Sequence, residues 1–233
     1  PSCGAINTGI NIQLIGGATA YLANTTTTTR ILNFFVCPSD TPLDALNDGP
    51  SFGTGTPYAG WKAARSNYLL PGSRYHEPHN PRYMNVAFSG RPDDEAVFSG
   101  TDWSTKIASV RDGAANTTLV IESKQEKMNK QFGGYWGQGV WTSTHMLVYN
   151  PNDPIYGPDS EWTKPNAKAT AAQSGNPSQK HGYAWTASSG HPGGVHAAFV
   201  DGSVKFILNS INPSVWFAIQ TIRSKELLGS DDF

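Results

Sequence analysis

The sequence predicts an α+β fold with a mainly antiparallel β-sheet, long loop excursions and a C-terminal helix. The first indication is composition: of 233 residues only 15% are charged, while 24 are Gly and 16 are Pro, which is typical of a loop-rich, β-leaning protein. The second is a hairpin pattern followed by a helical pattern over residues 195–223. No internal repeat or clear boundary is visible, so we expect a single globular body over residues 1–233.

Three short β-prone runs precede the C-terminal region. Residues 31–36 are apolar and end at Cys37-Pro38, which predicts a buried strand or extended segment. Residues 66–70 predict a second strand. Residues 117–122 are rich in β-branched side chains and predict a central strand.

The C-terminal region carries the clearest local signals. Residues 195–200 and 203–208 predict two strands joined by the two-residue turn Asp201-Gly202. Asn212 is a plausible N-cap, and Pro213 suits the first turn of a helix that extends to Arg223. We therefore expect a hairpin followed by a helix.

Several function classes lack support in the sequence. The net charge is -1 and no basic cluster occurs, so nucleic-acid binding is not expected. No Gly-x-Ser-x-Gly elbow is present, and the glycine-rich runs lack both the Walker lysine and the dinucleotide spacing. The sequence thus predicts neither a nucleotide site nor an enzyme.

Two weaker patterns leave alternatives open. His76 and His79 flank Glu77-Pro78, but the zinc-protease pattern needs His-Glu-x-x-His on a helix, so loop packing is the preferred interpretation. Seven Trp residues could stack on sugars, although buried aromatics are commoner. A secreted carbohydrate-binding module is therefore the alternative function, with a metal-dependent hydrolase third.

The two cysteines, Cys3 and Cys37, are a candidate disulfide. Closing a loop of about 35 residues would contribute about 3 to 4 kcal/mol. Two independent buried thiols are the other interpretation. Neither their spacing nor a nearby His indicates a zinc site.

Four sequence blocks carry a resemblance to a known family. His191-Pro-Gly193-Gly194 through Asp201-Gly202 resembles the His-x9-Asp-Gly signature of a prepilin-type, processing-associated bacterial family abundant in planctomycete-like bacteria. The other blocks follow the family's order and are Cys37-Pro38-Ser39-Asp40, Asp112-Gly113 with Asn116 and Glu122, and the tail from Trp216 to Phe233. Ala115 stands where the family usually has Ser.

The resemblance implies a pilin-like body that normally packs on an upstream apolar helix, which this chain does not contain. It also implies an extracytoplasmic protein, in the periplasm or at the cell surface, anchored in the inner membrane before assembly. Members are similar to type II secretion pseudopilins and type IV pilins. The expected function is a non-enzymatic structural or interaction subunit whose partners, other protein subunits, bind the irregular stretches 41–100 and 129–190.

For the motif residues we expect structural roles. Gly202 supplies positive φ in the turn, Gly193-Gly194 allow close chain approach, and His191 hydrogen-bonds the hairpin or the preceding loop. No cofactor is expected. The functional alternatives are that His191 and Asp201 line a site, or that Asp40 and Asp201 help to hold calcium.

Overall fold

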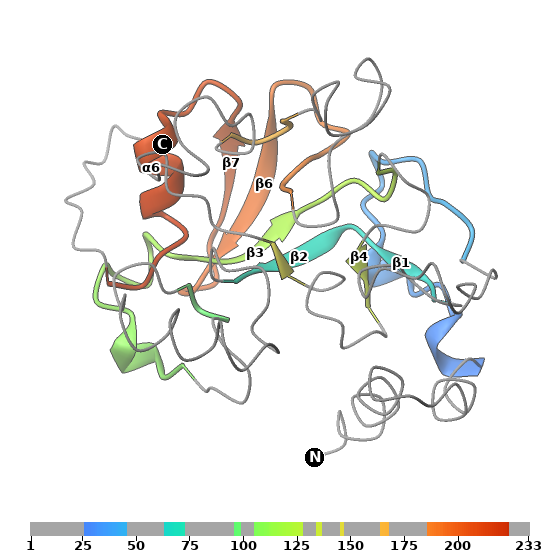
Figure 1. Cartoon of the computed structure of the whole chain (residues 1–233), viewed down its shortest axis with the longest axis horizontal. Coiled ribbons are helices and arrows are strands. Elements are labelled where there is room, and N and C mark those ends of the chain that lie inside the picture. The colour runs from blue at the N-terminus through green and yellow to red at the C-terminus, as the bar shows by residue number, and fades with distance from the viewer. Residues whose placement is uncertain are drawn as a thin grey trace, which may run out of the picture.

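The computed structural model describes residues 26–45, 63–72, 96–98, 105–127, 134–136, 145–146, 164–167 and 186–223. The described elements (Figure 1) are the 3-10 helices η1 (Asn33–Phe35) and η3 (Ile107–Ser109), the helix α6 (Pro213–Ala218), and the strands β1 (Arg65–Ser66), β2 (Tyr68–Pro71), β3 (Thr118–Glu122), β4 (Gly134–Tyr135), β5 (His145–Met146), β6 (Gly194–Phe199) and β7 (Val204–Leu208).

A five-stranded sheet organises these elements in the order β5-β2-β3-β6-β7. Its neighbouring strands are antiparallel, except for the parallel pair β2 and β5. Strands β1 and β4 form a separate antiparallel pair. The predicted α+β class with a mainly antiparallel sheet is confirmed, and β3 is the central strand that the sequence predicts.

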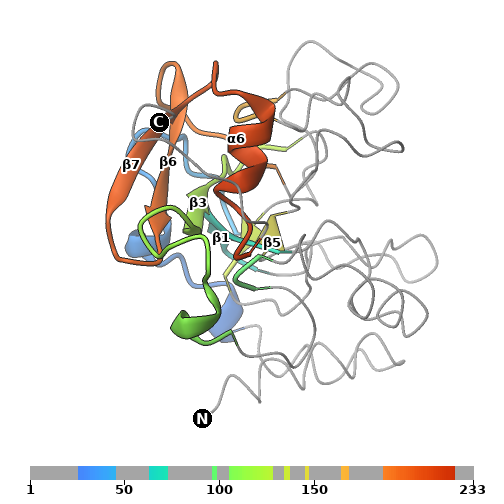
Figure 2. The same cartoon turned by 90° about the vertical axis from the view of Figure 1, so that its left-hand side faces the viewer.

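One face of the sheet forms the apolar core. Alternation along β6 places Val195, Ala197 and Phe199 in this core, where each is almost fully buried. Trp216 of helix α6 and Ile219 at its C-cap cover them, and Figure 2 shows α6 on one side of the β6–β7 hairpin. Burial of each large apolar side chain contributes about 1.5 to 3 kcal/mol, so this contact holds the C-terminal helix on the sheet.

The opposite face of the sheet carries a row of side chains across β3, β6 and β7 that includes a carboxylate and an imidazole. Ile121 pairs with Ala197, so the next residue, Glu122, faces His196 across the strands. His196 in turn pairs with Phe206 on β7. Because neighbouring residues of a strand point to opposite faces, this row faces away from α6.

The hairpin turn is longer than the sequence predicts. The amide of Gly202 donates to the Phe199 carbonyl at 2.9 Å, and the Phe199 amide donates to the Ser203 carbonyl at 2.8 Å. This is a three-residue loop in which Gly202 takes the left-handed position, with φ of 87°. The two-residue turn was therefore wrong in length, but the positive φ at Gly202 is confirmed.

Two other local predictions also need correction. Residues 33–35 form η1 rather than a strand, because the Val36 amide bonds back to the Asn33 carbonyl and Phe34 is exposed. Helix α6 begins as predicted, with the Asn212 side chain accepting from the Ser214 amide. It ends at Ala218 rather than at Arg223.

Candidate functional site

The motif residues gather at the two ends of the β3–β6 pair. Glu122 ends β3 and His191 shortly precedes β6, and both lie beside the segment that carries Cys37. At the other end of the same strands, the turn that holds Asp112 meets the hairpin tip at Asp201. We call the first group the Glu122 cluster, defined as Cys37, Ser39, Glu122, His191 and His196.

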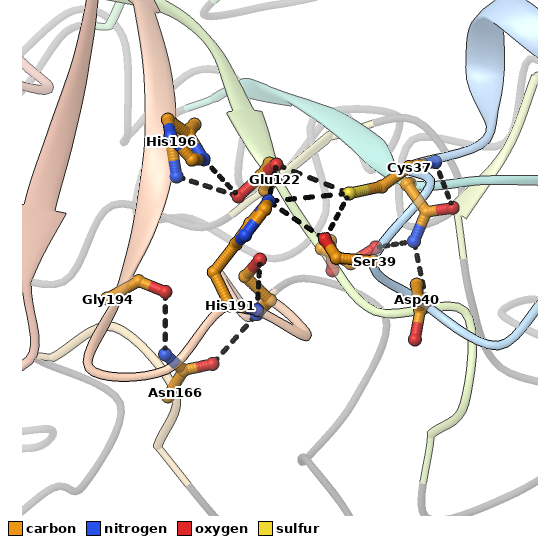
Figure 3. Close-up of polar contacts among 11 residues, drawn as sticks. Cys37, Ser39, Asp40, Glu122, Asn166, His191, Gly194 and His196 are labelled. Carbon is orange, nitrogen blue, oxygen red and sulfur yellow. Dashed lines mark hydrogen bonds and ion pairs between the residues drawn. The ribbon is translucent and has the colours of Figure 1, made fainter.

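Glu122 is the centre of this cluster (Figure 3), and its side chain is only 6% exposed. Its Oε1 lies 3.6 Å from Cys37 Sγ and 3.5 Å from His191 Nε2. Its Oε2 accepts the His196 amide at 2.7 Å and lies 3.4 Å from His196 Nδ1. One buried carboxylate thus joins three segments that are far apart in sequence.

The segment 37–39 closes over the polar row of the sheet. Cys37 Sγ lies 3.7 Å from His191 Nε2 and 3.0 Å from Ser39 Oγ. Ser39 Oγ also forms a 2.8 Å hydrogen bond with His191 Nε2. The sequence predicts that His191 bonds the hairpin or the preceding loop. Its backbone amide bonds Ser189 of that loop, whereas its ring bonds Ser39 of the N-terminal segment, a contact that the sequence did not predict.

Asn166 fixes the loop that carries His191. It has a left-handed backbone, with φ of 58°. Its side-chain oxygen accepts the Ser189 amide at 2.8 Å, while its side-chain nitrogen donates to the Gly194 carbonyl at 3.2 Å. A further hydrogen bond lies within the loop itself, where the His191 amide donates to Ser189 Oγ.

A second group of hydrogen bonds adjoins the Glu122 cluster at Cys37. Asn67 Oδ1 accepts the Cys37 amide at 2.9 Å, and Asn67 Nδ2 donates to Asp40 Oδ2 at 2.6 Å. The same Asp40 oxygen accepts the Gln125 amide at 2.9 Å. Asp40 therefore ties its own segment to Asn67, between β1 and β2, and to Gln125 after β3.

Lys127 is fully buried beside this group of hydrogen bonds. Its Nζ donates to Ser123 Oγ at 2.6 Å and lies 3.4 Å from Ser188 Oγ. Burial lowers the pKa of Lys127 to about 7, and the carboxylate of Asp40 opposes that shift. Near neutral pH this amine is close to its titration point.

The second motif group is a set of turns. Asn116 closes the turn of Gly113, whose φ is 98°, by donating its amide to the Gly113 carbonyl and its side-chain nitrogen to the Asp112 carbonyl. The Asp112 amide donates to the Ile222 carbonyl, and the Asp201 amide to the Ala114 carbonyl. These motif residues join the hairpin tip and the α6 region.

Asp201 uses its carboxylate locally. Its Oδ1 accepts from both the amide and the hydroxyl of Ser203, and these hydrogen bonds lower the pKa of Asp201. Because β6 separates Asp201 from His191, these two residues do not line a common site. Asp40 lies near Gly190, at the His191 end of β6, so Asp40 and Asp201 are not placed to share a calcium ion.

Glycines allow the close approach that the sequence predicts near His191. A Cβ on Gly194 would overlap the Ile207 carbonyl oxygen and stand 2.8 Å from the Phe206 ring. A Cβ on Gly190 would overlap the carbonyl oxygen of Ser39. Gly193 has a φ of 85°, so its role is conformational.

Other sequence candidates are only partly described. Cys3, His76 and His79 lie outside the described residues. Cys37 is buried and forms no disulfide within the described part of the chain, and its bond to Cys3 stays a prediction. Of the Trp residues, Trp216 is buried in the core, and Trp136 stacks against Phe35 with ring centroids 6.0 Å apart; the others lie outside the described part, so the sugar platform stays untested.

Several residues around the site were not anticipated from sequence: Asn67, Gln125, Lys127, Asn166 and His196. Asn67 and Gln125 are single polar residues without a motif, and only the pairing of β2 with β3 brings them together. His196 had no distinguishing neighbour in sequence. Its position one residue before Ala197 in an alternating strand was the available signal, because it placed this imidazole on the face opposite the core.

The geometry of the Glu122 cluster argues against a nucleophilic triad. A triad needs a base that contacts the nucleophile through one ring nitrogen and is oriented through the other. Here Cys37, Ser39 and Glu122 all contact the same atom, His191 Nε2. These contacts therefore do not form a proton relay that passes through both ring nitrogens of His191.

The fold and the cluster define a class of α+β body in which distant motif blocks are joined by buried polar contacts. The chain belongs to the family described as protein of unknown function (DUF1559), which matches residues 12–214. Comparison with curated proteins and with solved structures gives no match. Among the described residues, no helix has the length and apolar character needed to cross a bilayer.

Proposed function

We propose that the protein is a non-enzymatic structural or interaction subunit of a pilus-like, secretion-associated or cell-surface assembly, located outside the cytoplasm and held by an upstream helix. Membership of the family leaves the function open. The prepilin-type motif blocks of the sequence support the assembly, the location and the anchor. The partners are other protein subunits.

An exposed apolar strand edge is the observation that carries this proposal. Val204, Phe206 and Leu208 of β7 are 64%, 38% and 53% exposed. Strand β7 ends the sheet and pairs with β6 alone among the described strands. An open edge with apolar side chains favours pairing with another protein chain.

The polar contacts of the motif residues support a structural role. Glu122 and Asp40 accept hydrogen bonds from backbone amides, and Asn116 donates one to a backbone carbonyl. Such contacts hold segments in place. Catalysis by the Ser39 and His191 pair would instead need a group that orients the imidazole through its other ring nitrogen.

Charge substitution on β7 tests the proposal. The double variant Val204→Lys with Leu208→Lys is compared with Ile107→Lys, which changes an equally apolar side chain that is 74% exposed on η3. Native electrophoresis of gently solubilised cell envelopes should find the wild type and Ile107→Lys in a high-mass complex and the β7 variant released from it. Wild-type protein that migrates as a monomer, or a β7 variant that stays in the complex, would contradict the proposal.

A further inference from the structure

Three donor atoms of the Glu122 cluster converge on one point. Cys37 Sγ, Glu122 Oε1 and His191 Nε2 all lie within 4.8 Å of one another. They come from three separate sequence blocks, and two of the three residues are buried. Figure 3 shows the thiol, the carboxylate and the imidazole pointing toward one another.

The separations match a tetrahedral zinc site. Zinc bonds of about 2.3 Å to sulfur, about 2.05 Å to nitrogen and about 2.1 Å to oxygen place the donor atoms about 3.4 to 3.6 Å apart at the tetrahedral angle. The measured separations are 3.6 Å for sulfur to oxygen, 3.7 Å for sulfur to nitrogen and 3.5 Å for oxygen to nitrogen. Each lies within about 0.1 Å of that geometry.

The surroundings fix these donors in orientation. The second oxygen of Glu122 is held by the His196 amide, and the Cys37 amide is held by Asn67. The His191 loop is held by Asn166 through its neighbour Ser189. Partners of this kind raise metal affinity by keeping ligands in place.

We propose that Cys37, Glu122 and His191 bind a zinc-class divalent cation, with Ser39 Oγ or a water molecule at the fourth position. A thiolate, an imidazole and a carboxylate are ligands that Zn²⁺ accepts. Ser39 Oγ lies 2.8 Å from His191 Nε2 and 3.0 Å from Cys37 Sγ, which is closer than tetrahedral donor separations, so as a fourth ligand it would move away from both atoms. The ion would join the segment of Cys37, the end of β3 and the loop before β6.

This site excludes the Cys3–Cys37 disulfide, because a bonded sulfur is not a thiolate ligand. The zinc-site proposal does not depend on the proposed assembly role, so an experiment can contradict one of the two proposals and leave the other standing. Zinc binding also requires loss of the thiol proton.

The test uses Co²⁺ and Zn²⁺ on the full chain, purified under reducing conditions. Titration with Co²⁺ should give a thiolate-to-cobalt charge-transfer band that saturates at one equivalent and is displaced by Zn²⁺. Cys37→Ser and His191→Gln should lose the band, while His145→Gln, which removes a histidine from β5, should keep it. Because the His191 side chain is 31% exposed, His191→Gln should fold normally, as circular dichroism would show.

A second measurement identifies the sulfur. In a Cys3→Ser background, Cys37 is the only thiol, and Zn²⁺ should slow its alkylation at least tenfold. The proposal is overturned by a wild type that gives no cobalt band, by a band that survives Cys37→Ser, or by native protein in which Cys37 is found bonded to Cys3.

Discussion

Buried Lys127 makes stability depend on pH in a direction set by its folded-state pKa. That pKa is about 7, against 10.5 for a free lysine, so the folded state releases its proton first. Between these values the unfolded chain binds more protons, and the free energy of unfolding rises with pH by about 1.4 kcal/mol per unit. Below pH 7 both states are protonated and this contribution is flat.

From pH 7.5 to 9.0 the gain attributable to Lys127 is about 2 kcal/mol. Urea unfolding followed by tryptophan fluorescence, at several pH values in this window, measures it. Lys127→Met removes the titrating group but leaves Ser123 bonded to the Thr186 carbonyl and Ser188 bonded to the Lys124 amide. Other groups titrate in both proteins and cancel in the difference.

The expected result is a rising difference between the wild type and Lys127→Met across the window. Lys205→Met on the hairpin leaves Lys127 in place and should keep the wild-type pH dependence. Parallel curves for the wild type and Lys127→Met would refute the reasoning, since they would mean that the buried amine does not titrate there.

Further predictions concern the turns and contacts that position the site. Gly202→Ala should cost about 1 to 2 kcal/mol in urea unfolding, because its φ is positive but a Cβ there meets nothing within 4 Å. Gly194→Ala should cost more, about 3 kcal/mol, since its Cβ would overlap the Ile207 carbonyl; equal costs would contradict this. Asn67→Ala should cost about 3 kcal/mol by leaving buried polar partners unpaired, and a loss below 1 kcal/mol would show that water replaces its amide. Asn212→Ala should cost about 1 kcal/mol through loss of the helix cap, measured as a lower thermal midpoint, and an unchanged midpoint would show that this cap contributes little.

The sequence predicts best where structure is decided locally. Alternation and turn chemistry place β6 and β7, and the cap at Asn212 places the start of α6. The prediction fails at residues 31–36, where an apolar run forms η1 instead of a strand. That segment packs against the chain at Asn67, through the Asn67 amide and the Phe35 carbonyl, a contact that no local pattern reveals.

The candidate site, too, is predictable from the sequence only where local motifs identify its residues. Glu122, His191 and Cys37 are all contained in motif blocks, so a resemblance identifies them one by one. Their meeting depends on the register of β3 with β6 and on the path of the N-terminal segment, which are properties of the folded chain. Asn67, which holds Cys37 in place, carries no motif at all.

The most direct test of the proposed role is photo-crosslinking at Leu208 of β7 in the cells that make the protein. A photoreactive residue at this position should give a defined adduct with another protein subunit, whereas the same residue at Ile107 should not. Mass spectrometry of the adduct would then identify the partner at the strand edge. If Leu208 gives no protein adduct, or gives the same products as Ile107, the edge is not an assembly surface and the account is contradicted.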